Sequence, residues 1–199
     1  MNLQLGVTYG MRSTLIGALI RFSVEYPGVR VNIVFGTTSE LIEKLSHLDL
    51  DFALTFAEGN KEKIFNFFPL FTSRMTLVAA KNSYLTNRES VTLKEITNLP
   101  LALPTKGYST TKFVTEAFEI SNLSPNILIE INDIPTLLEL AKSGNWFTIL
   151  AQTTVTEKDD LITIPIKGKN MIRTAMLISL KDAYEKKAMT VFYKFLITE

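Results

Sequence analysis

The first 56 residues alternate between the spacing of a strand and the spacing of a helix, and this alternation constrains the fold more than any other feature of the chain. Residues 3–7 place apolar side chains at every second position, as a half-buried strand does. Apolar residues then recur at helical spacing over residues 15–22, and Tyr26-Pro27-Gly28 ends the predicted helix. A second strand is expected at residues 29–35, and a third, largely buried one at residues 51–56.

A second helix is expected between the second and third strands. Thr37 and Glu40 have the spacing of a capping box, in which each side chain binds a backbone amide of the other residue, so this helix is predicted to start near Thr38. The order strand, helix, strand, helix, strand requires a parallel sheet with right-handed crossover connections. The sequence therefore predicts an α/β lobe at the start of the chain.

The second half of the chain repeats this order and predicts a second α/β lobe. Further strands are expected at residues 75–80, 101–103, 127–131, 147–150, 161–166 and 171–180, with helices starting near Thr92, over 109–121 and 134–142, and in the closing segment. Two crossings between lobes are expected, so that residues 1–80 and 171–199 form lobe I and residues 81–170 form lobe II. Two Rossmann-like lobes joined by two hinge crossings make a clamshell, whose strand ends and helix starts line a common cleft.

The totals exclude several classes of protein. Twenty-one Lys and Arg residues balance twenty Asp and Glu residues, so no general field attracts the chain to nucleic acid or anionic membranes. Cysteine is absent and His47 is the only histidine, which leaves no thiol nucleophile, triad or metal-ligand cluster. We expect a protein that is not an enzyme and needs no cofactor. Without an export signal or a long apolar stretch, it is expected to be soluble and cytoplasmic.

Three segments combine hydroxyl side chains with glycine, and they lie at the positions where open α/β sheets bind their ligands. They are residues 8–14, 36–39 and 105–110, and each lies between a predicted strand end and a helix start, where unpaired N–H groups favour anions. For each hydroxyl the alternative is an N-cap that serves only its own helix. Asp133, before Ile134-Pro135, is expected to cap its helix in this way.

Arg12 and Lys106 are the cations nearest to these segments, and an anionic ligand would need such a partner or several amides. Exposed arginine and lysine are also common without any such role. Gly107 is expected to allow a positive φ or a close approach of the ligand, and a plain turn explains it equally well.

The first predicted helix carries a second apolar stripe, formed by Ile16, Ile20 and Val24. One stripe suffices to dock a helix on a sheet, so the second predicts a surface for a partner. The alternative is a wider contact within the same chain.

A succession of short motifs runs through nearly the whole chain. In order, they are Leu5-Gly6-Val7-Thr8, Tyr26-Pro27-Gly28-Val29, Gly36-Thr37-Thr38-Ser39-Glu40-Leu41, Leu50-Asp51-Phe52-Ala53, Pro69-Leu70-Phe71, Leu99-Pro100-Leu101 and Leu123-Ser124-Pro125. Their order and spacing resemble the effector-binding domain of LysR-type transcriptional regulators. One departure is Trp146, which stands where the family has a glycine, and which either fills core space or narrows the cleft.

The resemblance implies a type II periplasmic-binding-protein-like clamshell that binds a small effector. The family's effector contacts map onto Thr8 and its following loop, onto Thr37 or Thr38, and onto Ser109 with its neighbours. With the nearby cations, the expected ligand-binding residues are Thr8, Tyr9, Gly10, Arg12, Thr37, Thr38, Thr105, Lys106, Gly107, Ser109 and Thr110. The family also pairs the first helix with the second lobe of another copy, which implies a homodimer through Ile16, Ile20 and Val24, and a tetramer of the full-length protein. DNA is expected to be bound only through a winged helix-turn-helix that this chain lacks.

Three functions remain in view. The first is an effector-binding regulatory domain that responds to a small metabolite, and anionic metabolites are among those considered. The second is a solute-binding protein of a transporter, which shares the clamshell fold and would carry an export signal. The third is an enzyme on the same scaffold, of the phosphoribosyltransferase or dehydratase kind, for which no catalytic group stands out.

Overall fold

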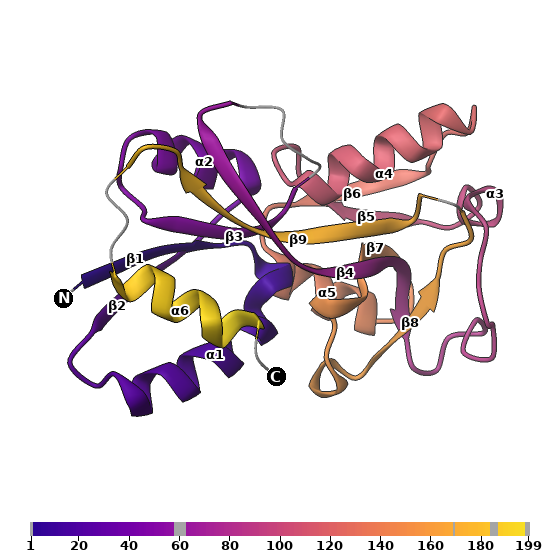
Figure 1. Ribbon diagram of the computed structural model, residues 1–199. Helices are drawn as coiled ribbons and strands as arrows, with labels where there is room; N and C mark the ends of the chain where they lie inside the picture. Colours follow the sequence, from indigo (N-terminus) through magenta and orange to yellow (C-terminus); the bar gives the residue numbers. More distant parts are fainter. Residues whose placement is uncertain (1, 58–62, 169, 184–186, 198–199) are drawn as a thin grey trace. The chain divides into compact units, whose positions relative to one another are not determined.

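The computed structural model describes residues 2–57, 63–168, 170–183 and 187–197, and its chain divides into two compact units. Unit 1 comprises Met1–Thr72 and Thr174–Glu199, and unit 2 comprises Ser73–Arg173. The chain changes unit within two long strands, β4 (Phe65–Ala80) and β9 (Ile172–Leu180) (Figure 1).

The changes of unit fall inside strands, after residues 72 and 173, whereas the sequence predicted them after residues 80 and 170. The first differs because β4 is one continuous strand from Phe65, of which only the part from Met75 was predicted. Pro69 lies in the part of β4 that was not predicted as a strand. A proline has no N–H to donate to a neighbouring strand, so its presence in a sequence argues against predicting a strand there.

Unit 1 contains the predicted parallel arrangement of strands and helices. Its elements besides the crossing strands are β1 (Asn2–Val7), the 3₁₀ turn η1 (Tyr9–Met11), α1 (Arg12–Glu25), β2 (Arg30–Phe35), α2 (Thr38–Ser46), β3 (Phe52–Phe56) and α6 (Lys187–Ile197). The strands of unit 1 lie in the order β2-β1-β3-β9. β1 is parallel to both β2 and β3, and β9 is antiparallel to β3, which confirms the predicted α/β class for this unit.

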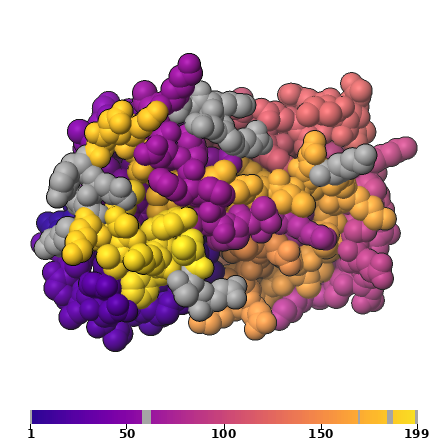
Figure 2. Space-filling view, in the orientation of Figure 1, coloured from indigo at the N-terminus to yellow at the C-terminus, as the bar shows by residue number. Residues whose placement is uncertain are grey.

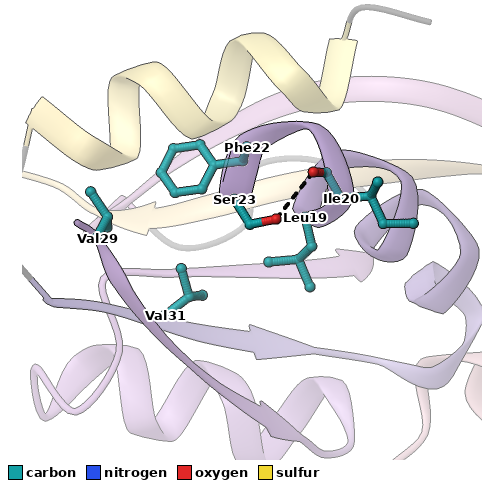
Figure 3. A pocket seen from close by; sticks show the side chains of 6 residues that line it. All are labelled: Leu19, Ile20, Phe22, Ser23, Val29 and Val31. Atoms are coloured by element: carbon teal, nitrogen blue, oxygen red, sulfur yellow. Dashed lines mark hydrogen bonds between the residues drawn. The ribbon is translucent and has the colours of Figure 1, made fainter. Parts of the chain in front are cut away.

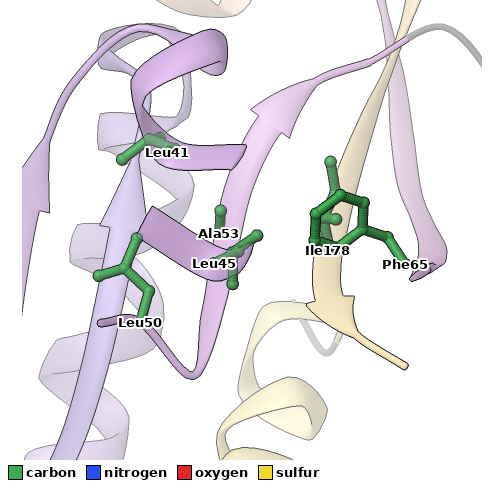
Figure 4. Packing of buried hydrophobic residues seen from close by; sticks show 6 residues of the cluster. All are labelled: Leu41, Leu45, Leu50, Ala53, Phe65 and Ile178. Atoms are coloured by element: carbon green, nitrogen blue, oxygen red, sulfur yellow. The ribbon is translucent and has the colours of Figure 1, made fainter. Parts of the chain in front are cut away.

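Helices cover both faces of this sheet. Ala53 packs in a buried cluster with Leu41 and Leu45 of α2, and Figure 4 shows these side chains gathered with Ile178 of β9. Phe52, the neighbour of Ala53, contacts Phe192 of α6 instead, with a centroid separation of 5.7 Å. Successive side chains of a strand point to opposite faces, so α2 and α6 lie on opposite sides of the sheet.

An aromatic cluster joins α1 to α6. The ring of Phe22 lies 5.1 Å from Phe192, 5.6 Å from Phe195 and 5.1 Å from Tyr26. Arg21 adds a hydrogen bond from its guanidinium to the carbonyl oxygen of Phe195, at 2.6 Å. In Figure 2 the helix α6, in yellow, forms the surface beside the indigo α1. The C-terminal helix therefore completes the core of unit 1.

Unit 2 has the predicted second set of strands and helices. They are α3 (Leu93–Ile96), β5 (Leu101–Pro104), α4 (Ser109–Ile120), β6 (Ile127–Ile131), α5 (Ile134–Lys142), β7 (Thr148–Ala151), the turns η2 (Gln152–Thr154) and η3 (Glu157–Asp159), and β8 (Leu161–Pro165). β5 and β6 pair in parallel, while β4 pairs antiparallel with β7 and with β8. Within the described residues, no helix is long and apolar enough to cross a membrane.

Asp133 caps α5, as predicted, and its contacts give stability a pH dependence. Its carboxylate accepts hydrogen bonds from the Thr136 hydroxyl at 2.6 Å and the Thr136 N–H at 2.9 Å, and these bonds lower the pKa of Asp133. Because the pKa of Asp133 is lower in the folded than in the unfolded protein, its ionised carboxylate stabilises the fold at pH values above the unfolded-state pKa. This stabilisation is lost as pH falls through the folded-state pKa. We expect Asp133→Ala to lower Tm at pH 7, with a difference from wild type that shrinks below about pH 4.

Thermal unfolding followed by circular dichroism at pH 7 and pH 3 measures this difference. Asp49→Ala, at an exposed position, is the matched control and should lower Tm little at pH 7. A difference for Asp133→Ala that stays constant between the two pH values would contradict the assignment.

Candidate functional site

The first predicted segment lies where β1 ends in unit 1. Thr8 is buried, and its backbone N–H donates to the carbonyl oxygen of Leu54 at 2.9 Å, while its hydroxyl reaches the same oxygen at 3.4 Å. Thr8 precedes η1 but makes no side-chain cap. Tyr9 and Gly10 form that 3₁₀ turn and are half-buried. The capping alternative therefore does not account for Thr8.

The second segment lies beside the first. The N–H of Gly36 donates to the carbonyl oxygen of Val7 at 3.2 Å, so the ends of β1 and β2 are adjacent. Thr37 caps α2 with a full capping box, in which its hydroxyl donates to the Glu40 carboxylate at 3.0 Å and accepts from the Glu40 N–H at 3.3 Å. For Thr37 the structure thus shows the capping role.

Thr38 makes a different contact, with a residue that the sequence did not single out. Its hydroxyl lies 2.6 Å from the hydroxyl of Thr55 at the end of β3, and Thr55 is fully buried. The ends of β1, β2 and β3 therefore bring Thr8, Thr38 and Thr55 to one edge of the unit 1 sheet. Thr55 was missed because it sits inside a strand that reads as continuously apolar; a hydroxyl within such a run is the only signal in the sequence.

The third segment belongs to unit 2 and forms a tight turn before α4. The N–H of Tyr108 donates to the carbonyl oxygen of Thr105 at 3.3 Å, and Gly107 has a φ of 103°, the positive value expected for it. The N–H of Thr105 donates to the Ile131 carbonyl at 3.1 Å, which places the turn at the ends of β5 and β6. Thr110 is half-buried in the first turn of α4.

Ser109 opens α4 and contacts a buried arginine. Its hydroxyl accepts a hydrogen bond from Nη1 of Arg173 at 3.3 Å. Ser109 is not an N-cap, since the N-cap position of α4 is Tyr108. The guanidinium of Arg173 also lies over the ring of Phe113, 5.1 Å from its centroid. Arg173 was not predicted as a site residue because it lies far along the chain, in an apolar run that gives no local signal.

The two cations proposed from sequence have different surroundings. Arg12 lies over the ring of Tyr9, 4.8 Å from its centroid, and is half-buried. Lys106 is exposed, and no described residue pairs with its ammonium group. A cation stacked on an aromatic ring is partly stabilised in place, whereas a solvated lysine is not.

The second stripe of α1 faces solvent. Ile16, Ile20 and Val24 are 47%, 62% and 80% exposed, so a wider contact within unit 1 does not explain them. Ile20 also borders a shallow surface hollow of about 350 Å³ between α1 and β2, with Phe22 and Val31 among its other lining residues (Figure 3). An apolar stripe beside an apolar hollow is typical of an interaction surface.

Two further expectations concern the rest of the chain. Among the described residues, no group of three or more His, Asp or Glu side chains could hold a metal ion. Trp146, just before β7, is half-buried. It is therefore neither fully buried, as a residue that fills core space would be, nor fully exposed, as a residue that narrows the cleft would be.

Comparison with known proteins assigns the family. Residues 2–199 match the LysR substrate binding domain family, and the chain belongs to it. It is 26% identical over 196 residues to an uncharacterized HTH-type transcriptional regulator, YybE, of Bacillus subtilis, covering 98% of this chain and 67% of that protein. It is 24% identical over 202 residues to the regulator BbuR of Bordetella bronchiseptica, covering all of this chain and 62% of that protein.

Solved structures share the fold over nearly the whole chain. The effector binding domain of QuiR in complex with shikimate superposes with a TM-score of 0.85 at 20% identity, covering 99% of this chain and 95% of that one. The regulatory domain of CcmR from Synechocystis, in complex with 2-PG, gives 0.87 at 16% identity, covering 98% and 95%. These likenesses confirm the type II periplasmic-binding-protein-like class. The regulators among its relatives support a regulatory domain and leave the transporter and the enzyme without support.

Proposed function

We propose that this chain is the effector-binding domain of a LysR-type transcription regulator and binds a small metabolite at residues 8–14, 36–39 and 105–110. Family membership over residues 2–199 is the observation that carries the proposal. The hydroxyls of Thr8, Thr38 and Ser109, at strand ends and a helix start, supply polar contacts of the kind that orient small ligands. Two structural neighbours were solved with small ligands, shikimate and 2-PG, which favours a metabolite of that size.

The proposed mechanism is a shift of population. A metabolite that binds one arrangement of the protein better than another favours that arrangement, and only this difference in affinity can change DNA binding elsewhere in the regulator. The DNA contacts would come from a winged helix-turn-helix outside this chain. Since its target is DNA, we place the regulator in the cytoplasm.

Calorimetric titration of a metabolite panel tests the site. For a metabolite that binds wild type, we expect Thr8→Ala and Ser109→Ala each to weaken binding about three- to tenfold, since each removes one hydrogen-bonding hydroxyl. Ser46→Ala, at the opposite end of α2 from Thr38, is the matched control and should bind as wild type does. Unchanged affinity in both site variants would reject these positions.

We also propose that the domain forms a homodimer through the stripe of Ile16, Ile20 and Val24. Unit 2 carries exposed apolar side chains on its surface that such a stripe would contact, among them Ile120 at the end of α4, 81% exposed, and Leu128 of β6, 61% exposed. Pairing α1 of one copy with this surface of the other would bury both patches twice, as a two-fold interface does. Such a dimer could assemble further into the tetramer expected of the full-length protein.

A further inference from the structure

A hollow of about 520 Å³ lies in the surface of unit 1, where β4 begins and β9 ends. The N–H of Lys181 donates to the carbonyl oxygen of Ile64 at 2.7 Å and joins the two strand ends. β9 is antiparallel to β3, with Ile178 opposite Ala53, so the hollow lies towards the start of β3. Thr55 lies at the opposite end of β3. The hollow is therefore separate from the unit 1 segments of the proposed effector site.

Three phenylalanines supply the apolar part of this hollow. Phe65 is 3% exposed and belongs to the buried cluster that Figure 4 shows, and the ring of Phe67 lies 6.5 Å from its ring. The ring of Phe68 packs instead beside Tyr193 of α6, at 5.8 Å. Contacts on both faces of the sheet thus hold the rings in place. The full set of lining residues is Lys63, Phe65, Asn66, Phe67, Phe68 and Lys181.

The polar residues of the hollow favour an anion. Lys63 and Lys181 are both exposed, and no described residue forms an ion pair with either of them. Asn66 is half-buried, and its side-chain amide has no hydrogen-bond partner among the described residues. None of the lining residues is acidic. Two lysines that border one hollow without an acidic residue in its lining attract negative charge.

The beginning of β4 is also an edge of the sheet. β7 and β8 pair with β4 only from Met75 and Thr76 onwards, so β9 is the one described strand beside residues 65–72. Alternate N–H groups of an edge strand point away from the sheet and are free to donate. Pro69 has no N–H, and a proline or a lysine at an edge discourages a further strand from pairing there. The edge is therefore better suited to a small ligand than to another strand.

We propose that this hollow is a second ligand site of the domain and binds a phosphate monoester carried on an aromatic ring. The ring would pack against the phenylalanines, and the phosphate would accept hydrogen bonds from the two ammonium groups and the Asn66 amide. Two lysines match the charge of a phosphate monoester, which is close to −2 at neutral pH. The volume is also suitable, since small-molecule pockets measure roughly 300–1,000 Å³. The proposal does not depend on the effector site.

Phenyl phosphate is a suitable probe, and two simpler compounds separate its two parts. Inorganic phosphate lacks the ring, and benzyl alcohol lacks the charge. The backbone amide signals of the 199-residue chain are followed by two-dimensional NMR during titration with each compound. We expect phenyl phosphate to cause saturable shifts at residues 63–68 and 181, and each simpler compound to bind there at least about threefold more weakly.

A double variant, Lys63→Gln with Lys181→Gln, tests the two cations. Both side chains are exposed, so the fold should tolerate the change, and we expect the Kd for phenyl phosphate to rise about tenfold. Lys94→Gln is the matched control, because Lys94 is an exposed lysine of unit 2, and its Kd should equal that of wild type. Added sodium chloride should weaken binding to wild type more than binding to the double variant.

Three results would each overturn the proposal. The first is the absence of saturable shifts at residues 63–68 and 181, including the case in which only residues 8–14, 36–39 or 105–110 respond. The second is equal binding of phenyl phosphate and benzyl alcohol, which would show that the charge is not recognised. The third is an unchanged Kd in the double variant. All three leave the effector site to the metabolite titration, which tests it separately.

Discussion

Replacing Phe22 with alanine is expected to lower the free energy of unfolding by about 3–5 kcal/mol, the usual cost of removing a large aromatic side chain from a packed core. Phe22 is 1% exposed and its ring contacts Tyr26, Phe192 and Phe195. These contacts hold α6 against α1, so the substitution removes the principal connection between the C-terminal helix and the rest of unit 1. Urea unfolding followed by circular dichroism and fluorescence measures the effect.

Ile20→Ala is the matched control for this prediction. Ile20 lies on the same helix but is 62% exposed, so its truncation should change the free energy of unfolding of the monomer by less than about 0.5 kcal/mol. A loss of less than about 1 kcal/mol for Phe22→Ala would show that the space is refilled by neighbouring rings, contrary to the packing described.

Replacing Ile20 with aspartate is expected to abolish self-association of the domain. In a two-fold interface the substitution introduces a charge at two places, each in a surface that must lose water to pair. We expect the dimer dissociation constant to rise at least about a hundredfold, since charges at the centre of an interface cost several kcal/mol. Sedimentation equilibrium over a range of concentrations measures this constant.

Ile120→Asp, on the surface of unit 2 proposed to receive α1, should weaken association equally. Leu48→Asp is the control, because Leu48 is 68% exposed but follows α2, on the other face of the unit 1 sheet from α6. A wild type that stays monomeric at about 100 µM, or a dimer that tolerates both Ile20→Asp and Ile120→Asp, would refute this interface.

The elements that depend on neighbouring residues could be predicted from sequence. The starts of α2 and α5 follow from capping residues, Thr37 and Asp133, whose partners lie three positions further on. The bounds of α5 and β6 agree with their expected ranges. Regular helical spacing of apolar residues and the cap mark the ends of α5, and apolar alternation between turns marks the ends of β6. Gly107 took the positive φ expected of a glycine in a turn.

The parts of the site that depend on distant partners could not be predicted. Thr55 meets Thr38 across 17 positions, and Arg173 meets Ser109 across 64. Neither Thr55 nor Arg173 has a neighbour in sequence that marks it, since each lies in a run of strand residues whose periodicity indicates burial only. The three hydroxyl segments had such a signal, because glycine and serine or threonine gather at the ends of elements.

The division of the chain into units also bears on the order in which the protein can fold during synthesis. Unit 2 is one uninterrupted stretch, Ser73–Arg173, whereas unit 1 needs Thr174–Glu199 as well as the beginning of the chain. Because β9 pairs with β3 and Phe192 packs on Phe22, a nascent chain cannot close the core of unit 1 until β9 and α6 have been synthesised. We therefore expect its apolar β1–α1 region to stay exposed during synthesis for longer than the core of unit 2.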